Sequence, residues 1–148
     1  MKDKIVYLCL GIALTVIFFI FSEEVYEALY YSPAFNNGLH NTGLYNIITL
    51  ITIAMAWGAA AIYYYAVNSV RWDRWWHWLV VLAIVVVLNP IICYGMTVQT
   101  FNSNGMTFPG EALSFEAFNM LVTAGLFIVA SFSMRWWSSN CRHTPIPQ

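Results

Sequence analysis

Four stretches of this chain contain no charged residue, and each is about as long as the roughly 20 residues that cross the hydrocarbon core of a bilayer. They are residues 5–22, 44–68, 78–98 and 117–134. None alternates apolar with polar residues as barrel strands do, and a helix satisfies its own backbone hydrogen bonds in lipid. Only 9% of the residues are charged, against about 25% in soluble domains. The sequence therefore predicts an all-α integral membrane protein, with residues 1–148 forming a single four-helix transmembrane domain.

The basic residues indicate how this domain is oriented. All six lie on one side of the predicted helices: Lys2, Lys4, Arg71, Arg74, Arg135 and Arg142. The opposite loops, 23–43 and 99–116, contain no Lys or Arg and hold five of the seven acidic residues. The positive-inside rule places the inner loop 69–77, the tail 135–148 and both termini in the cytoplasm. We expect two consecutive helical hairpins in a bacterial-type inner (plasma) membrane.

Tryptophan and arginine crowd the predicted cytoplasmic edge. The segment "SVRWDRWWHW" covers residues 69–78, and a shorter version, "SMRWW", covers 133–137. Indole rings favour the headgroup region and arginine reaches lipid phosphate, so an aromatic belt that anchors the protein is the favoured interpretation. A docking surface for a protein partner is the alternative, because Trp and Arg dominate binding hot spots. The residues concerned are Arg71, Trp72, Arg74, Trp75, Trp76, Trp78, Arg135, Trp136 and Trp137.

The recurrence of this segment suggests a parallel tandem repeat of residues 1–74 and 75–148. "FNNG" at 35–38 is echoed by "FNSNG" at 101–105. In such a repeat the pseudo-twofold axis lies along the membrane normal, as in some transporters. Asn46 and Asn119 would then be symmetry mates that face each other. Chance and a shared interfacial composition explain the same short matches.

No ionisable residue falls within the four predicted spans, which weighs against a proton relay or a haem site there. Polar side chains within or at the ends of the spans are candidates either for a water-filled path or for contacts between helices. They are Asn89, Pro90, Asn46, Asn119, Thr49 and Thr123. A small, mildly polar stripe on one face of the second span favours close packing of helices over a pore. It consists of Thr49, Thr52, Ala56, Ala59 and Tyr63.

The loops and cysteines give little chemistry. Cys9, Cys93 and Cys141 lie at three different depths without a C-x-x-C pair, and a metal site needs more ligands than a Cys141 and His143 pair supplies. We predict no metal site and no catalytic residue. In the outer loop, "SEEVYEALYYSPAF" predicts a short amphipathic surface helix that Pro33 ends.

These observations favour a non-catalytic membrane subunit that anchors or stabilises a larger membrane protein complex. The alternative is a homo-oligomeric channel or small permease with a path near Asn89 and Pro90. A third class is a membrane enzyme, with Asp73, His77 or His143 at the inner edge, or an immunity-type protective membrane protein. No cofactor is predicted, although bound lipid is expected. The expected partners are the bilayer and other membrane subunits or copies of this chain, and nucleic acid is not among them.

Overall fold

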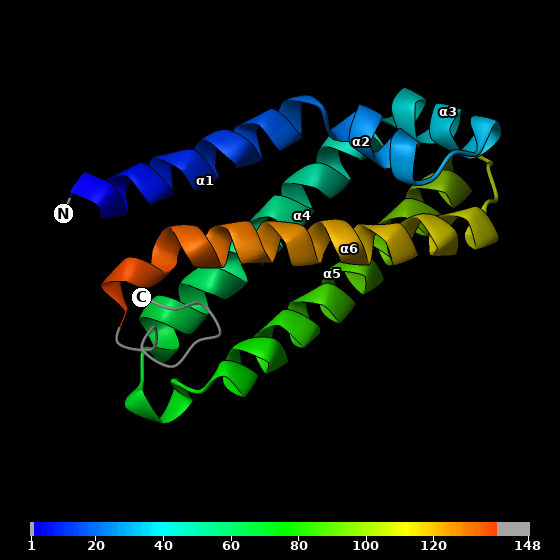
Figure 1. The fold of residues 1–148 in the computed structure, drawn as a ribbon. Helices are drawn as coiled ribbons and strands as arrows, with labels where there is room; N and C mark the ends of the chain where they lie inside the picture. The colour runs from blue at the N-terminus through cyan, green and yellow to red at the C-terminus, as the bar shows by residue number, and fades with distance from the viewer. Residues whose placement is uncertain (1, 139–148) are drawn as a thin grey trace.

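The computed structural model describes residues 2–138, and this part of the chain consists of helices and short connections, without a strand (Figure 1). The elements, in order, are α1 (Lys2–Ile20), α2 (Ser22–Leu29), α3 (Pro33–Thr42), α4 (Leu44–Ala61), the π-helical continuation η1 (Ile62–Val67), the short 3₁₀ turn η2 (Val70–Trp72), α5 (Trp75–Ser103), α6 (Pro109–Met134) and the 3₁₀ turn η3 (Arg135–Trp137).

Four of these helical segments are long and apolar enough to cross a membrane, as predicted. They cover Asp3–Ile20, Leu44–Val67, Trp75–Ser103 and Pro109–Trp137. Helix α1 begins three residues before its charge-free stretch, and α5 and α6 extend further beyond theirs. At 1.5 Å per residue, the 29 residues of α5 and the 26 of α6 span about 44 and 39 Å. Only residues 104–108 connect them, so the outer loop is shorter than the predicted 99–116.

The bundle has one end rich in basic residues and one rich in acidic residues. The start of α1, the turn η2 and the end of α6 lie together on the left of Figure 1. Lys4 donates to the carbonyl of Trp136 at 3.2 Å, and the Tyr65 hydroxyl donates to the carbonyl of Met134 at 2.9 Å. We call this the basic end. The acidic end, on the right of Figure 1, consists of α2, α3 and the connection between α5 and α6.

The acidic end contains two short helices where the sequence predicted one. The prediction that Pro33 ends a helix is wrong, because α2 already ends at Leu29 and Pro33 begins α3. Proline suits the first turn of a helix, where its missing N–H leaves no bond unmade. Gly43 then separates α3 from α4 with φ of 69°, a left-handed conformation that glycine adopts without strain.

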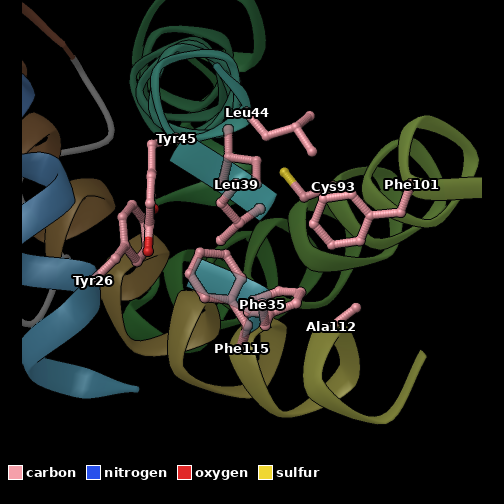
Figure 2. Close-up of a cluster of buried hydrophobic side chains, with 10 residues drawn as sticks. Tyr26, Phe35, Leu39, Leu44, Tyr45, Cys93, Phe101, Ala112 and Phe115 are labelled. Carbon is pink, nitrogen blue, oxygen red and sulfur yellow. The ribbon is translucent and has the colours of Figure 1, made fainter. Parts of the chain in front are cut away.

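Aromatic side chains from all five of the helices α2 to α6 form the core of the acidic end (Figure 2). Phe35 on α3 is fully buried, and its ring centroid lies 5.5 Å from that of Phe101 and 5.6 Å from that of Phe115. Asn36 fixes the same helix to α4, since its amide nitrogen donates to the Tyr45 hydroxyl at 2.6 Å. The cap therefore packs on the bundle as part of the same core.

The helices α4, α5 and α6 pack closely on one another, whereas α1 packs mainly along α6. Helix α1 lies at the edge of the bundle (Figure 1), and most of its side chains are exposed. The predicted stripe on α4 does face the interior at Thr49, Thr52 and Ala56, but its next buried member is Ala60 in place of the predicted Ala59. The packing of three helices thus defines the interior that holds the polar side chains.

Candidate functional site

A network of buried polar side chains joins α4, α5 and α6. Asn89 on α5 is fully buried, and its amide nitrogen donates to the hydroxyl of Thr52 on α4 at 3.0 Å and to that of Thr123 on α6 at 2.9 Å. The Cys93 thiol lies 3.7 Å from the Asn89 carbonyl oxygen, to which it donates a weak bond. One side chain therefore connects three membrane-spanning helices.

Asn119 on α6 is the second centre of this network. Its carbonyl oxygen accepts a hydrogen bond from the Tyr26 hydroxyl at 2.8 Å and one from the Thr52 hydroxyl at 3.3 Å. Its backbone carbonyl accepts from Thr123 at 2.7 Å. Because Tyr26 lies on α2, the network also ties the acidic end to the three packed helices. We call Tyr26, Thr52, Asn89, Asn119 and Thr123 the polar network.

Glu116 extends the polar network toward a groove between α5 and α6. Only 3% of its surface is exposed, and its Oε2 accepts from the Asn119 amide at 2.8 Å. Its Oε1 is buried and has no hydrogen-bond partner among the described residues. The groove it lines has a volume of about 320 Å³ and also contains Pro90 and Tyr94. The sequence placed Glu116 in a loop because a charged residue ended the apolar stretch, but the helix begins earlier, at Pro109.

Tyr26 keeps its proton at the edge of this network. The side chain is fully buried, and burial raises the pKa of its hydroxyl far above the usual range. A protonated hydroxyl is what the Asn119 carbonyl oxygen requires as a donor. Sequence reasoning missed Tyr26 because it belongs to a short amphipathic segment, and nothing in its spacing pointed to α6.

The predicted polar residues divide into those that the fold brings together and those that it leaves apart. Asn89, Asn119 and Thr123 belong to the polar network. Thr49 is buried but donates to the Tyr45 carbonyl of its own helix at 2.7 Å. Asn46 is exposed, so the expectation that Asn46 and Asn119 face each other is wrong. Helix α4 turns its neighbour Tyr45 inward, where the aromatic core fills the space.

Pro90 follows Asn89 inside the continuous helix α5 and is also buried. It cannot donate a backbone hydrogen bond, so the carbonyl four residues earlier loses its usual partner. The side chains of Asn89 and its partners are nevertheless fully enclosed. The geometry therefore describes a set of interhelical contacts at this position, with no opening to solvent at Asn89.

The basic end exposes most, but not all, of the predicted tryptophan and arginine residues. Five are exposed between η2 and the first turn of α5: Arg71, Trp72, Arg74, Trp75 and Trp76. Trp137 is exposed as well. Trp78, however, is only 6% exposed, and its indole N–H donates to Ser131 on α6 at 3.1 Å. Trp78 lies in the first turn of α5 and points at α6. Because it is buried there, it does not belong to the exposed surface of the basic end.

Arg135 and Trp136 are also packed within the protein. Arg135 is 5% exposed, and its guanidinium carbon lies 4.0 Å from the centroid of the Trp136 ring, which is a cation–π contact. The Trp136 ring stacks on Tyr7 of α1 with centroids 5.0 Å apart. These two residues join α1 to α6, so among the arginines within residues 2–138 the exposed ones are Arg71 and Arg74.

A second groove opens between α4 and α5 on the lateral surface of the bundle. Its volume is about 450 Å³, and every lining residue is apolar. The residues are Ala54, Met55, Gly58, Ala59, Ile62, Val81, Ile84, Val85 and Leu88. A Cβ atom added to Gly58 would meet nothing within 4 Å, so this position is open.

Within residues 2–138, no group of three or more His, Cys, Asp or Glu side chains is arranged to hold a metal ion. Cys141, Arg142 and His143 lie outside the described residues. Comparison of the chain with protein-family models, with curated protein sequences and with solved structures gives no match.

Proposed function

We propose that this chain is a non-catalytic integral membrane subunit that anchors or stabilises a larger membrane protein complex. In this proposal the four spans form two consecutive hairpins in a bacterial-type plasma membrane. The basic end faces the cytoplasm, because Lys4, Arg71 and Arg74 belong to it while α2 contributes Glu23, Glu24 and Glu27 to the other end.

The character of the buried polar side chains supports a structural role. Each hydrogen bond of Asn89 and Asn119 joins or stabilises helices, and both side chains have 0% exposure. A path for ions or solutes needs polar groups that face water. The polar network therefore favours a rigid scaffold over the alternative of a channel that runs past Asn89 and Pro90 in a single copy.

The groove between α4 and α5 is the single observation that carries the proposal. In lipid, helices associate where small residues allow their backbones to approach closely. Ala54, Gly58 and Ala59 supply such a surface, and the bulkier Ile62 and Leu88 also line the groove. A transmembrane helix of another subunit fits a groove of this composition, since both surfaces are apolar and neither must be stripped of water.

Gentle extraction of the tagged protein, followed by native mass measurement of the intact particle, tests the proposal. We expect other chains in fixed ratio, and we expect Gly58→Leu to release them. A Cβ atom at Gly58 meets nothing within 4 Å, so a side chain at this position extends into the open groove. Gly95→Leu is the matched control, because Gly95 on α5 is exposed, equally free of neighbours and outside the groove.

A particle that contains only copies of this chain contradicts the subunit proposal. If Gly58→Leu then converts that particle to monomers, the groove joins identical chains, and the homo-oligomeric alternative takes its place. A wild-type monomer without partners contradicts both.

A further inference from the structure

A hollow at the basic end is separate from the polar network and from both lateral grooves. It has a volume of about 580 Å³ and lies where η2 meets the start of α5. Its lining residues are Val70, Arg71, Asp73, Arg74, Trp76 and His77. Two arginines and one aspartate thus line the same hollow, and these three side chains carry a formal net charge of +1.

The backbone around this hollow presents unpaired donors to an anion. Arg74 precedes the first turn of α5 in an extended conformation, with φ of −80° and ψ of 146°, and no side chain caps the helix. The His77 N–H already donates to the Arg74 carbonyl at 3.0 Å, whereas the N–H groups of the first two helical residues, Trp75 and Trp76, have no partner within the helix. Because α5 continues for 29 residues, its dipole adds partial positive charge at this end.

His77 gives a second and independent indication of a ligand. The side chain lines the hollow, yet it is only 8% exposed, and its buried Nδ1 has no hydrogen-bond partner among the described residues. The rings of Trp76 and Trp72 hold it in place, with centroids 3.7 and 4.9 Å away. Buried polar atoms are nearly always hydrogen-bonded, so an imidazole nitrogen without a partner within residues 2–138 is a candidate for contact with a ligand in the hollow.

The turn that carries the arginines is fixed by the fold. The Tyr63 hydroxyl donates to the Trp72 carbonyl at 2.9 Å, and the Trp72 N–H donates to the Ser69 carbonyl at 2.9 Å. The Arg71 N–H donates to the Ser69 hydroxyl at 3.3 Å. A preformed turn loses less conformational freedom on binding than a flexible loop.

We propose that this hollow binds the phosphate of an anionic phospholipid in the leaflet that faces the basic end. Arg71 and Arg74 are exposed, and their guanidinium groups donate hydrogen bonds to the phosphate oxygens. The N-terminus of α5 supplies backbone donors. Asp73 cancels one of the two positive charges, which suits a singly charged phosphodiester. The exposed apolar surface of Val70, which is 74% accessible, receives the lipid's glycerol and acyl region.

Native mass spectrometry of the full chain in detergent tests this site with phosphatidylglycerol, phosphatidylcholine and inorganic phosphate as probes. We expect the wild-type protein to retain phosphatidylglycerol in preference to phosphatidylcholine. The double variant Arg71→Gln with Arg74→Gln should weaken phosphatidylglycerol binding by more than about tenfold, because two charge-assisted contacts are lost. Lys4→Gln removes one positive charge at the same end and is the control, since Lys4 contacts the Trp136 carbonyl and does not line the hollow.

Several outcomes overturn the proposal. One is equal binding of phosphatidylglycerol by the double variant and the wild type. Another is an equal loss in Lys4→Gln, which shows general attraction to the basic end in place of a site. If inorganic phosphate displaces phosphatidylglycerol when the two are at similar concentrations, the hollow is a site for a free anion and not for a lipid. Equal retention of the two lipids by the wild type also contradicts the proposal, and that comparison requires no folded variant.

Discussion

A Cβ atom added to Gly11 of α1 would lie 1.7 Å from the hydroxyl oxygen of Ser133 on α6. That hydroxyl is itself held in place, because it donates to the Val129 carbonyl of its own helix at 2.7 Å. Four residues after Gly11 on α1, the Thr15 hydroxyl accepts a hydrogen bond from the indole N–H of Trp57 on α4 at 3.1 Å. These contacts fix α1, which is otherwise mostly exposed, in one register against the bundle.

Replacing Gly11 by alanine should destabilise the protein by about 1–3 kcal/mol, the usual cost of overpacking a tight contact. Ser133→Gly in the same chain should recover most of this loss, because both of the close atoms, at 1.7 and 2.8 Å, belong to the Ser133 side chain. The free energy of unfolding in detergent, measured for the two single variants and the double variant, gives the coupling directly.

Gly125→Ala on α6 is the control for this cycle. A Cβ atom at Gly125 meets nothing within 4 Å, so alanine there should be neutral or stabilising by up to about 1 kcal/mol from its better helix propensity. Additive effects of Gly11→Ala and Ser133→Gly would show that α1 does not approach α6 at this point.

Asn89→Leu should destabilise the bundle by about 1–2 kcal/mol, because two interhelical hydrogen bonds within a membrane are worth roughly 0.6 kcal/mol each or somewhat more. The hydroxyls of Thr52 and Thr123 keep their own acceptors on Asn119, which limits the loss. Thermal or denaturant unfolding in detergent measures it.

Asn46→Leu is the matched control, since the same substitution on the exposed face of α4 should change stability by less than about 0.5 kcal/mol. A different pattern would revive the channel alternative. In that pattern, liposomes containing the wild-type protein conduct ions, whereas liposomes containing an Asn89→Leu variant of unchanged stability do not.

The number and approximate position of the membrane helices could be predicted because lipid imposes a simple rule on composition. Charge is excluded over a fixed length, and that length is visible in the chain. The same rule failed at helix ends. The fourth charge-free stretch begins just after Glu116, yet α6 already begins at Pro109. A helix can extend past the hydrocarbon as long as its backbone hydrogen bonds continue.

The partners of the polar residues could not be predicted from spacing alone. Asn89 was recognised as notable by its depth and by Pro90, but nothing in the sequence said that Thr52 and Thr123 would meet it. Asn46 and Asn119 occupy similar positions in the chain, and a rotation of α4 that buries Tyr45 separates their environments. Burial depends on the rotation of each helix, which the packing of its neighbours decides.

Glu116→Gln should stabilise the protein by about 1 kcal/mol, because a buried carboxyl is costlier than an amide of the same shape. The glutamine carbonyl can still accept from the Asn119 amide, so the existing bond at 2.8 Å is kept. Glu111→Gln is the control, as Glu111 lies on the same helix at the same end but is partly exposed. A loss of more than about 1 kcal/mol in Glu116→Gln would contradict this expectation and indicate that the carboxylate itself makes a stabilising contact.

Tyr26→Phe should remove one hydrogen bond to Asn119, at a cost of about 1 kcal/mol at neutral pH. It should also change the response to alkali. Burial raises the pKa of Tyr26, so in the unfolded chain this tyrosine ionises near pH 10 while in the folded protein it stays protonated. Its contribution to stability is fully present below about pH 10 and is lost as the pH rises further, by up to about 1.4 kcal/mol per pH unit.

Unfolding free energies measured between pH 8 and about pH 11 should therefore fall more steeply for the wild type than for Tyr26→Phe. Tyr31→Phe serves as the control, because the Tyr31 side chain is 64% exposed. Parallel curves for the wild type and Tyr26→Phe would mean that α2 separates from α6 before the tyrosine ionises. The hydrogen bond from Tyr26 to Asn119 would then not limit the stability of the acidic end in alkali.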